Sequence, residues 1–81
     1  MNVRLQLFAV ARQLAGAEFI ELILADGATV GELRRVLAEC RPELAHLLPH
    51  LMFAVNAEYA SDETRIPPDA ALACIPPVSG G

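Results

Sequence analysis

Residues 71–81 read Ala-Leu-Ala-Cys-Ile-Pro-Pro-Val-Ser-Gly-Gly. The first five are all apolar, which is typical of a strand that is buried on both faces in the middle of a sheet. Pro76 and Pro77 then fix φ and remove two backbone donors, so the strand ends and the chain continues in an extended, polyproline-like form. We therefore predict a domain over residues 1–75 whose last strand leads into a tail over residues 76–81.

The predicted tail contains no charged side chain and ends in Val78, Ser79, Gly80 and Gly81. Because glycine has no Cβ, a partner's walls can close directly on this backbone. The α-carboxylate of Gly81 is the distinctive reactive group of the tail. We expect a flexible, slender tip that fits a narrow tunnel. The alternative is a chain end without function, because termini are often disordered and rich in small residues.

Length and composition limit the possible functions. A chain of 81 residues predicts one domain with a modest core. Its apolar fraction of 54% exceeds the ordinary value of about 45 to 50%, so part of the surplus is expected to face a partner. The net charge of −4 opposes binding to nucleic acid or anionic lipid. There is no signal-peptide pattern and no uncharged run long enough to span a membrane, so we expect a cytoplasmic protein.

Period-2 alternation marks the first strand, in which Val3, Leu5 and Leu7 alternate with Arg4, Gln6 and Phe8. This spacing places Phe8 on the face opposite the core. A short helical segment over residues 9–14 stops at Gly16, and a second alternating strand over residues 20–24 ends at a turn. Residues 3–24 are therefore predicted to form one hairpin around a short helix.

The main helix is predicted to begin at Thr29, because Thr29-Val30-Gly31-Glu32 has the spacing of a capping box. Pro42 ends it. One face carries an apolar stripe that packs on the sheet, and the other carries Glu32, Arg34, Arg35 and Glu39. The stripe consists of Val30, Leu33, Val36, Leu37 and Cys40. Further strands follow at 51–55, 59–60 and 71–75, and residues 61–63 are predicted to be a solvated loop.

The chain resembles the family of small, sulfur-carrying subunits of molybdopterin synthase. The resemblance spans nearly the whole chain. Its motifs are Phe8-Ala9-x-x-Arg12-x-Leu14-x-Gly16, Thr29-Val30-x-x-Leu33, Val55-Asn56, Pro68-Asp69 and Pro76-Pro77-Val78-Ser79-Gly80-Gly81. The fold that this resemblance implies is α+β: a ubiquitin-like β-grasp with a mixed sheet of about five strands against one main helix.

The resemblance also implies a chemistry. A ubiquitin-activating-like adenylyltransferase would use ATP to adenylate Gly81, and a sulfur donor such as a cysteine desulfurase system would convert it to a thiocarboxylate. The tail, with Gly80 and Gly81 at its tip, would then donate sulfur to cyclic pyranopterin monophosphate inside the large synthase subunit, forming the dithiolene of molybdopterin. The expected assembly is a heterotetramer of two small and two large subunits. The chain would bind no stable cofactor and would not be an enzyme by itself.

Residues before the tip are expected to bind the partner: Phe8, Ile75, Pro76, Pro77, Val78 and Ser79. The alternative is that Phe8 and Ile75 are ordinary core residues. Cys40 and Cys74 have no CxxC spacing and are predicted to be buried free thiols, with Cys74 filling space rather than relaying sulfur. No metal site is expected, because His46 and His50 lack a convincing set of further ligands.

Two other interpretations of the function stay open. The chain could carry sulfur for thiamine or tRNA thiolation, or act as a ubiquitin-like modifier; the absence of lysine excludes lysine-linked chains of itself. A reading of another class is a β-grasp interaction module whose tail has no chemistry.

Overall fold

A computed structural model describes residues 1–77 of the chain. The predictions for Val78, Ser79, Gly80 and Gly81 lie outside the described residues. The elements are β1 (Asn2–Leu7), α1 (Ala9–Ala15), β2 (Phe19–Ile23), α2 (Val30–Cys40), the 3-10 turns η1 (Pro42–Leu44) and η2 (Leu48–His50), β3 (Met52–Val55), β4 (Glu58–Ala60) and β5 (Leu72–Ile75). The predicted succession of strands and helices is confirmed, and two 3-10 turns lie between α2 and β3.

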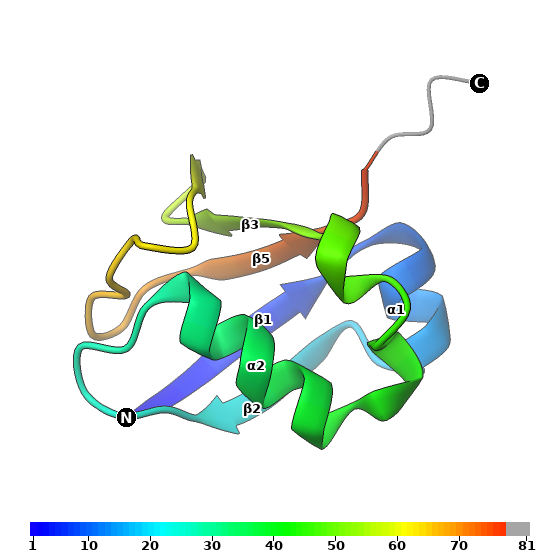
Figure 1. The fold of residues 1–81 in the computed structure, drawn as a ribbon, viewed down its shortest axis with the longest axis horizontal. Coiled ribbons are helices and arrows are strands. Elements are labelled where there is room, and N and C mark those ends of the chain that lie inside the picture. Colours follow the sequence, from blue (N-terminus) through cyan, green and yellow to red (C-terminus); the bar gives the residue numbers. More distant parts are fainter. Residues whose placement is uncertain (78–81) are drawn as a thin grey trace.

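The five strands form one mixed sheet in the order β2-β1-β5-β3-β4. β5 is parallel to β1 and antiparallel to β3, so the last strand is central, as its apolar sequence predicted. α2 lies across one face of this sheet (Figure 1). This arrangement confirms the expected β-grasp fold.

The core lies between α2 and the inner face of the sheet, which we define as the face that α2 covers. Alternate side chains of the strands meet the apolar stripe of the helix there, and burial of this apolar surface is the main source of stability. The buried residues include Val3, Leu5 and Leu7 of β1, Phe53 and Val55 of β3, Leu72 and Cys74 of β5, and Val30, Leu33 and Leu37 of α2.

α2 begins where the capping box predicted. The Thr29 hydroxyl accepts a hydrogen bond from the Glu32 N–H at 3.3 Å. The prediction of a buried thiol is wrong for Cys40, which is exposed. Cys40 is the last residue of α2, and the turn that follows packs Leu44 into the core in its place.

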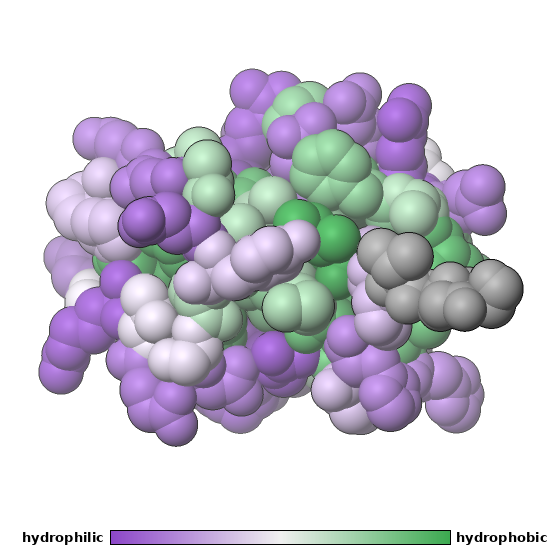
Figure 2. Space-filling model, turned by 90° about the horizontal axis from the view of Figure 1, so that it is seen from above, coloured by the Kyte–Doolittle hydropathy of each residue, from purple (hydrophilic) through white to green (hydrophobic). Residues whose placement is uncertain are grey.

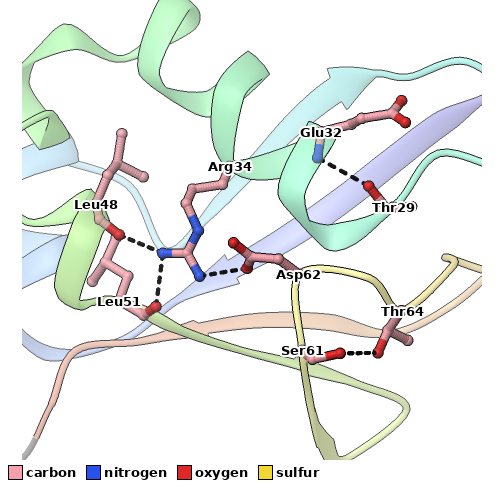
Figure 3. Close-up of polar contacts among 8 residues, drawn as sticks. All are labelled: Thr29, Glu32, Arg34, Leu48, Leu51, Ser61, Asp62 and Thr64. Atoms are coloured by element: carbon pink, nitrogen blue, oxygen red, sulfur yellow. Dashed lines mark hydrogen bonds and ion pairs between the residues drawn. The ribbon is translucent and has the colours of Figure 1, made fainter.

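Arg34 links three segments that are far apart in the sequence (Figure 3). Its Nη1 donates to the carbonyl oxygens of Leu48 and Leu51, the latter at 2.9 Å. Its Nη2 donates to Asp62 Oδ1 at 2.9 Å, and the Asp62 carbonyl accepts from the Gly31 N–H. The prediction that residues 61–63 form a solvated loop is confirmed, since all three are exposed, and Asp62 also anchors this loop to α2. Arg34 also fixes the backbone that enters β3.

Candidate functional site

The outer face of the sheet, opposite α2, carries an unusual number of apolar side chains for an exposed surface. Strand alternation assigns them to this face, because their neighbours in each strand point into the core. They include Phe19 and Ile23 of β2, Met52 and Ala54 of β3, Tyr59 of β4, and Ala73 and Ile75 of β5. Their distribution makes this face the first candidate for contact with a partner.

Four of these outer positions and Phe8, which follows β1, form a contiguous group that we call the outer patch: Phe8, Met52, Ala54, Ala73 and Ile75. Ala54 is buried within this group, and Phe8 and Met52 are its exposed members. Met52 pairs with Ile75, and Ala54 pairs with Ala73, across the β3–β5 ladder. Leu7 pairs with Cys74 in the parallel β1–β5 ladder. The next residues of the two strands are Phe8 and Ile75, and the same register places them side by side. The Phe8 N–H donates to the Cys74 carbonyl at 3.2 Å and keeps this part of the chain on β5.

The outer patch lies at the point where the chain leaves the sheet. Pro76, which follows Ile75 directly, is buried, and Pro77 is exposed. On the side of the molecule that holds β3 and the end of β5, apolar surface gathers in the middle and hydrophilic residues surround it (Figure 2). The structure thus brings the predicted residues Phe8, Ile75, Pro76 and Pro77 to one end of the sheet.

Phe8 and Ile75 are not core residues. The Phe8 side chain is 40% exposed, and Ile75 is half-buried on the outer face. Alternation in the first strand predicted the face of Phe8 correctly. Partner binding by Phe8, Ile75, Pro76, Pro77, Val78 and Ser79 stays a prediction, and the last two of these residues lie outside the described part of the chain.

Sequence reasoning missed Met52, although its side chain is 46% exposed within the outer patch. The segment 51–55 is so uniformly apolar that its faces cannot be separated by hydropathy alone. The face of Met52 can be assigned once β3 is aligned with β5. Met52 then pairs with the outward-facing Ile75, and Phe53 pairs with the buried Cys74.

The junction between β1 and α1 has unusual backbone geometry. Phe8 is the N-cap residue of α1, with extended dihedral angles, and provides no side-chain cap. Ala9 follows in the left-handed region, at φ = 52°. Nothing in the residue pattern predicted this conformation.

The buried cysteine is unsuited to nucleophilic chemistry. Burial raises the pKa of the Cys74 thiol from 9.0 to about 11, and the positive charge of Arg34 only partly offsets this effect. Because the thiolate is the nucleophilic form, Cys74 is unreactive near neutral pH. This agrees with its prediction as a space-filling residue of the last strand.

Other side chains offer little alternative chemistry. His46 and His50 are both exposed. Within residues 1–77, no group of three or more His, Cys, Asp or Glu residues is placed to hold a metal ion. No helix in the same part of the chain has the length and apolar character needed to cross a membrane.

Known proteins resemble this chain over nearly its full length. The "Molybdopterin synthase sulfur carrier subunit" of Arabidopsis thaliana is 32% identical over 81 residues, which cover 100% of this chain and 84% of the relative. A protein of the same name from Dictyostelium discoideum is 37% identical over 82 residues, covering 96% of this chain and 94% of the relative.

Solved structures give the same picture of the fold. Two crystal structures of small archaeal modifier protein 1, SAMP1, from Haloferax volcanii superpose with TM-scores of 0.86 and 0.84 at 27% and 25% identity. The first match covers 100% of both chains, and the second covers 95% of this chain and 98% of the other. Residues 5–81 match the ThiS family. This match, together with relatives more than 30% identical over at least 96% of the chain, shows that the chain belongs to the ThiS family.

Proposed function

We propose that this chain is the sulfur carrier subunit of a molybdopterin synthase. The observation that carries this proposal is its similarity, at 32% and 37% identity, to two proteins with that name. The outer patch, with its exposed Phe8 and Met52, supports it, because a carrier needs a surface on which a larger partner can bind while the tail enters that partner's active site. In this proposal residues 1–75 are the domain, residues 76–81 are the tail, and Gly81 is the C-terminal residue.

The proposed chemistry takes place on the Gly81 carboxylate. A carboxylate is a poor electrophile, so the activating adenylyltransferase first joins it to AMP and releases pyrophosphate from ATP. A persulfide of the donor system then displaces AMP and forms an acyl disulfide, which a thiol reduces to leave the thiocarboxylate. Attack of this sulfur on cyclic pyranopterin monophosphate forms a thioester, and water hydrolyses the thioester to restore the carboxylate and leave the sulfur on the pterin. Two such transfers supply the two sulfurs of the dithiolene.

The catalytic side chains of this reaction belong to the partner proteins. Cys74, the thiol nearest the tail in sequence, is buried and protonated near neutral pH. The small residues Gly80 and Gly81 let the partner enclose the reacting group closely. ATP serves the activating enzyme and is not a resident cofactor of this chain. The proposed partners are the large synthase subunit, in a heterotetramer, the adenylyltransferase and a cysteine desulfurase system, all cytoplasmic.

The intact mass of the protein purified from its own cells tests this proposal. A thiocarboxylate replaces one oxygen by sulfur, whereas a persulfide on a cysteine adds a whole sulfur atom, so the two modifications differ in mass. The matched control is Cys40→Ser, which removes the exposed thiol. We expect the oxygen-for-sulfur mass to persist in Cys40→Ser. Protein that is always unmodified in sulfur-replete cells would count against the proposal.

Changing the end of the chain provides a second test. Deletion of Gly81, or addition of one residue after it, should abolish sulfur transfer to the pterin while leaving the unfolding transition unchanged. The last residue of the core is Cys74, well before Gly81, so the fold does not depend on Gly81. Full activity of an extended protein that has not been trimmed would contradict a terminal sulfur carrier.

The likeness to small archaeal modifier protein 1 favours a second candidate function, covalent attachment to other proteins. The same adenylate would then react with an amine of a target. Incubation of the chain with ATP, its activating enzyme and cell extract separates the two functions, since a modifier yields an amide-linked conjugate. A carrier yields only the thiocarboxylate and free chain.

A further inference from the structure

We infer that Ala9 is a positioning residue whose left-handed backbone conformation directs Phe8 outward at the base of the tail. This inference rests on the proposed function, because it assigns Phe8 to the surface that the large subunit binds. It concerns a residue that contributes almost no side chain to that surface. Its effect is exerted through the backbone.

The junction at Phe8 and Ala9 breaks three local preferences at once. N-cap positions favour Ser, Thr, Asp or Asn, yet Phe8 occupies this one and provides no capping hydrogen bond. An alanine at φ = 52° is in a region that residues with a Cβ rarely adopt. An aromatic ring is left 40% exposed although the fold buries many smaller apolar groups. Unfavourable features that coincide in this way are typical of functional sites.

The backbone on both sides of Ala9 is held in place. The Phe8 N–H donates to Cys74 of β5, and the Phe8 carbonyl accepts from the Arg12 N–H at 3.4 Å inside α1. Phe8 therefore belongs to the sheet through its N–H and to the helix through its carbonyl. The change of direction between these two bonds falls on Ala9. Its left-handed conformation lets the chain turn into α1 while Phe8 keeps the outward alternation of β1 beside Ile75.

The test uses substitutions that differ in their tolerance of a left-handed backbone. Ala9→Val introduces a β-branched side chain, which disfavours this conformation strongly. Ala9→Gly permits it but also permits many others, so the direction of Phe8 is no longer fixed. We expect the Kd for the large subunit to rise at least about tenfold in Ala9→Val and about threefold in Ala9→Gly, as an anchor side chain loses its preorganised position.

Ala57 provides the matched control. It is also an alanine with positive φ, at 69°, but it lies in the turn between β3 and β4, away from Phe8. Ala57→Val and Ala57→Gly should affect folding much as the Ala9 variants do and leave the Kd for the large subunit unchanged. In the double variant Phe8→Ala/Ala9→Val, affinity should fall no further than in Phe8→Ala alone, because Ala9 acts through Phe8.

The outcomes separate this inference from the proposed function. If the unaltered chain does not bind the large subunit at all, the proposed function fails. If it binds, and folded Ala9→Val binds within twofold of it or Ala57→Val weakens binding equally, the positioning role is wrong. Should Ala9→Val fail to fold, Ala9→Gly decides, and an affinity equal to that of the unaltered chain would overturn the inference.

Discussion

Met52 and Phe53 are neighbours on β3, yet they belong to two surfaces with different physical roles. Phe53 is 1% exposed among the residues beneath α2, whereas Met52 is 46% exposed beside Ile75 on the outer patch. Both are large and apolar, so hydropathy treats them alike. The difference lies in what covers them: the chain's own helix covers the inner face at Phe53, whereas Met52 on the outer patch is exposed in the described part of the chain. The apolar surface of the inner face stabilises the fold, and the apolar surface of the outer patch is available to a partner.

The largest expected effect comes from truncating the inner face. Phe53→Ala should lower the free energy of unfolding by about 3 to 5 kcal/mol, because it removes buried surface and leaves a cavity. The measurement is chemical denaturation followed by circular dichroism. Affinity for the large subunit, measured where the variant is still folded, should be unchanged. A loss below about 1 kcal/mol would mean that the two faces do not differ as described.

A pH titration tests whether water is excluded from Cys74 on the inner face of the sheet. The Cys74 pKa is about 11 in the folded chain, above its ordinary value of 9.0. The protonated thiol therefore stabilises the fold below pH 9.0, and this contribution is lost as the pH rises toward 11. One pKa unit corresponds to about 1.4 kcal/mol, so the extra loss should reach about 2 to 3 kcal/mol.

Unfolding free energies of the unaltered chain and Cys74→Ala, measured across this range, test the effect. The variant should lack the extra loss, and Cys40→Ala should retain it because Cys74 is still present. The chain has no lysine, which removes one common group that titrates in this range. Parallel curves for the unaltered chain and Cys74→Ala would show that the thiol is not shielded from water.

On the outer patch, Phe8→Ala should act on binding and not on folding. We expect association with the large subunit to weaken by about 1 to 3 kcal/mol, the range of an aromatic anchor in an interface. Calorimetric titration gives the Kd, and denaturation gives the stability. Unchanged affinity together with a core-sized loss of about 3 to 5 kcal/mol would move Phe8 from the interface to the core.

The smallest expected effect is that of Met52→Ala, which can be compared directly with Phe53→Ala at the neighbouring position. Met52→Ala should change the free energy of unfolding by no more than about 0.5 kcal/mol, as is usual for exposed positions. It should weaken partner binding less than Phe8→Ala does, because it lacks an aromatic ring. The same denaturation and titration experiments apply. A destabilisation equal to that of Phe53→Ala would remove the contrast between the faces.

The arrangement of the sheet could be predicted from the sequence because it depends on local patterns. Alternation in β1 identified both its buried residues and the outward position of Phe8. The unbroken apolar sequence of β5 indicated its central place. The Thr29 capping box located the start of α2. Each of these features depends on residues only a few positions apart.

Features that depend on distant segments could not be predicted in the same way. Arg34 has the spacing of a surface residue, and only the fold brings it to Leu48, Leu51 and Asp62. Met52 needed the β3–β5 register before its face could be assigned. Cys40 fits the apolar stripe of α2, but it lies at the end of the helix, where the sheet no longer covers the stripe. The conformation of Ala9 is set by bonds on either side of it, to β5 and within α1.

β5 also affects how the protein is made. Without it, the sheet consists of two separate hairpins, β1–β2 and β3–β4, because β5 provides the pairings that join them. A nascent or proteolysed chain that lacks residues 72–75 would leave β1 and β3 as unpaired edges, which are prone to aggregation and degradation. The strand that completes the domain is also the strand from which the tail emerges. Only chains whose synthesis has passed β5, at the base of the tail, can therefore complete the sheet and reach the stable fold.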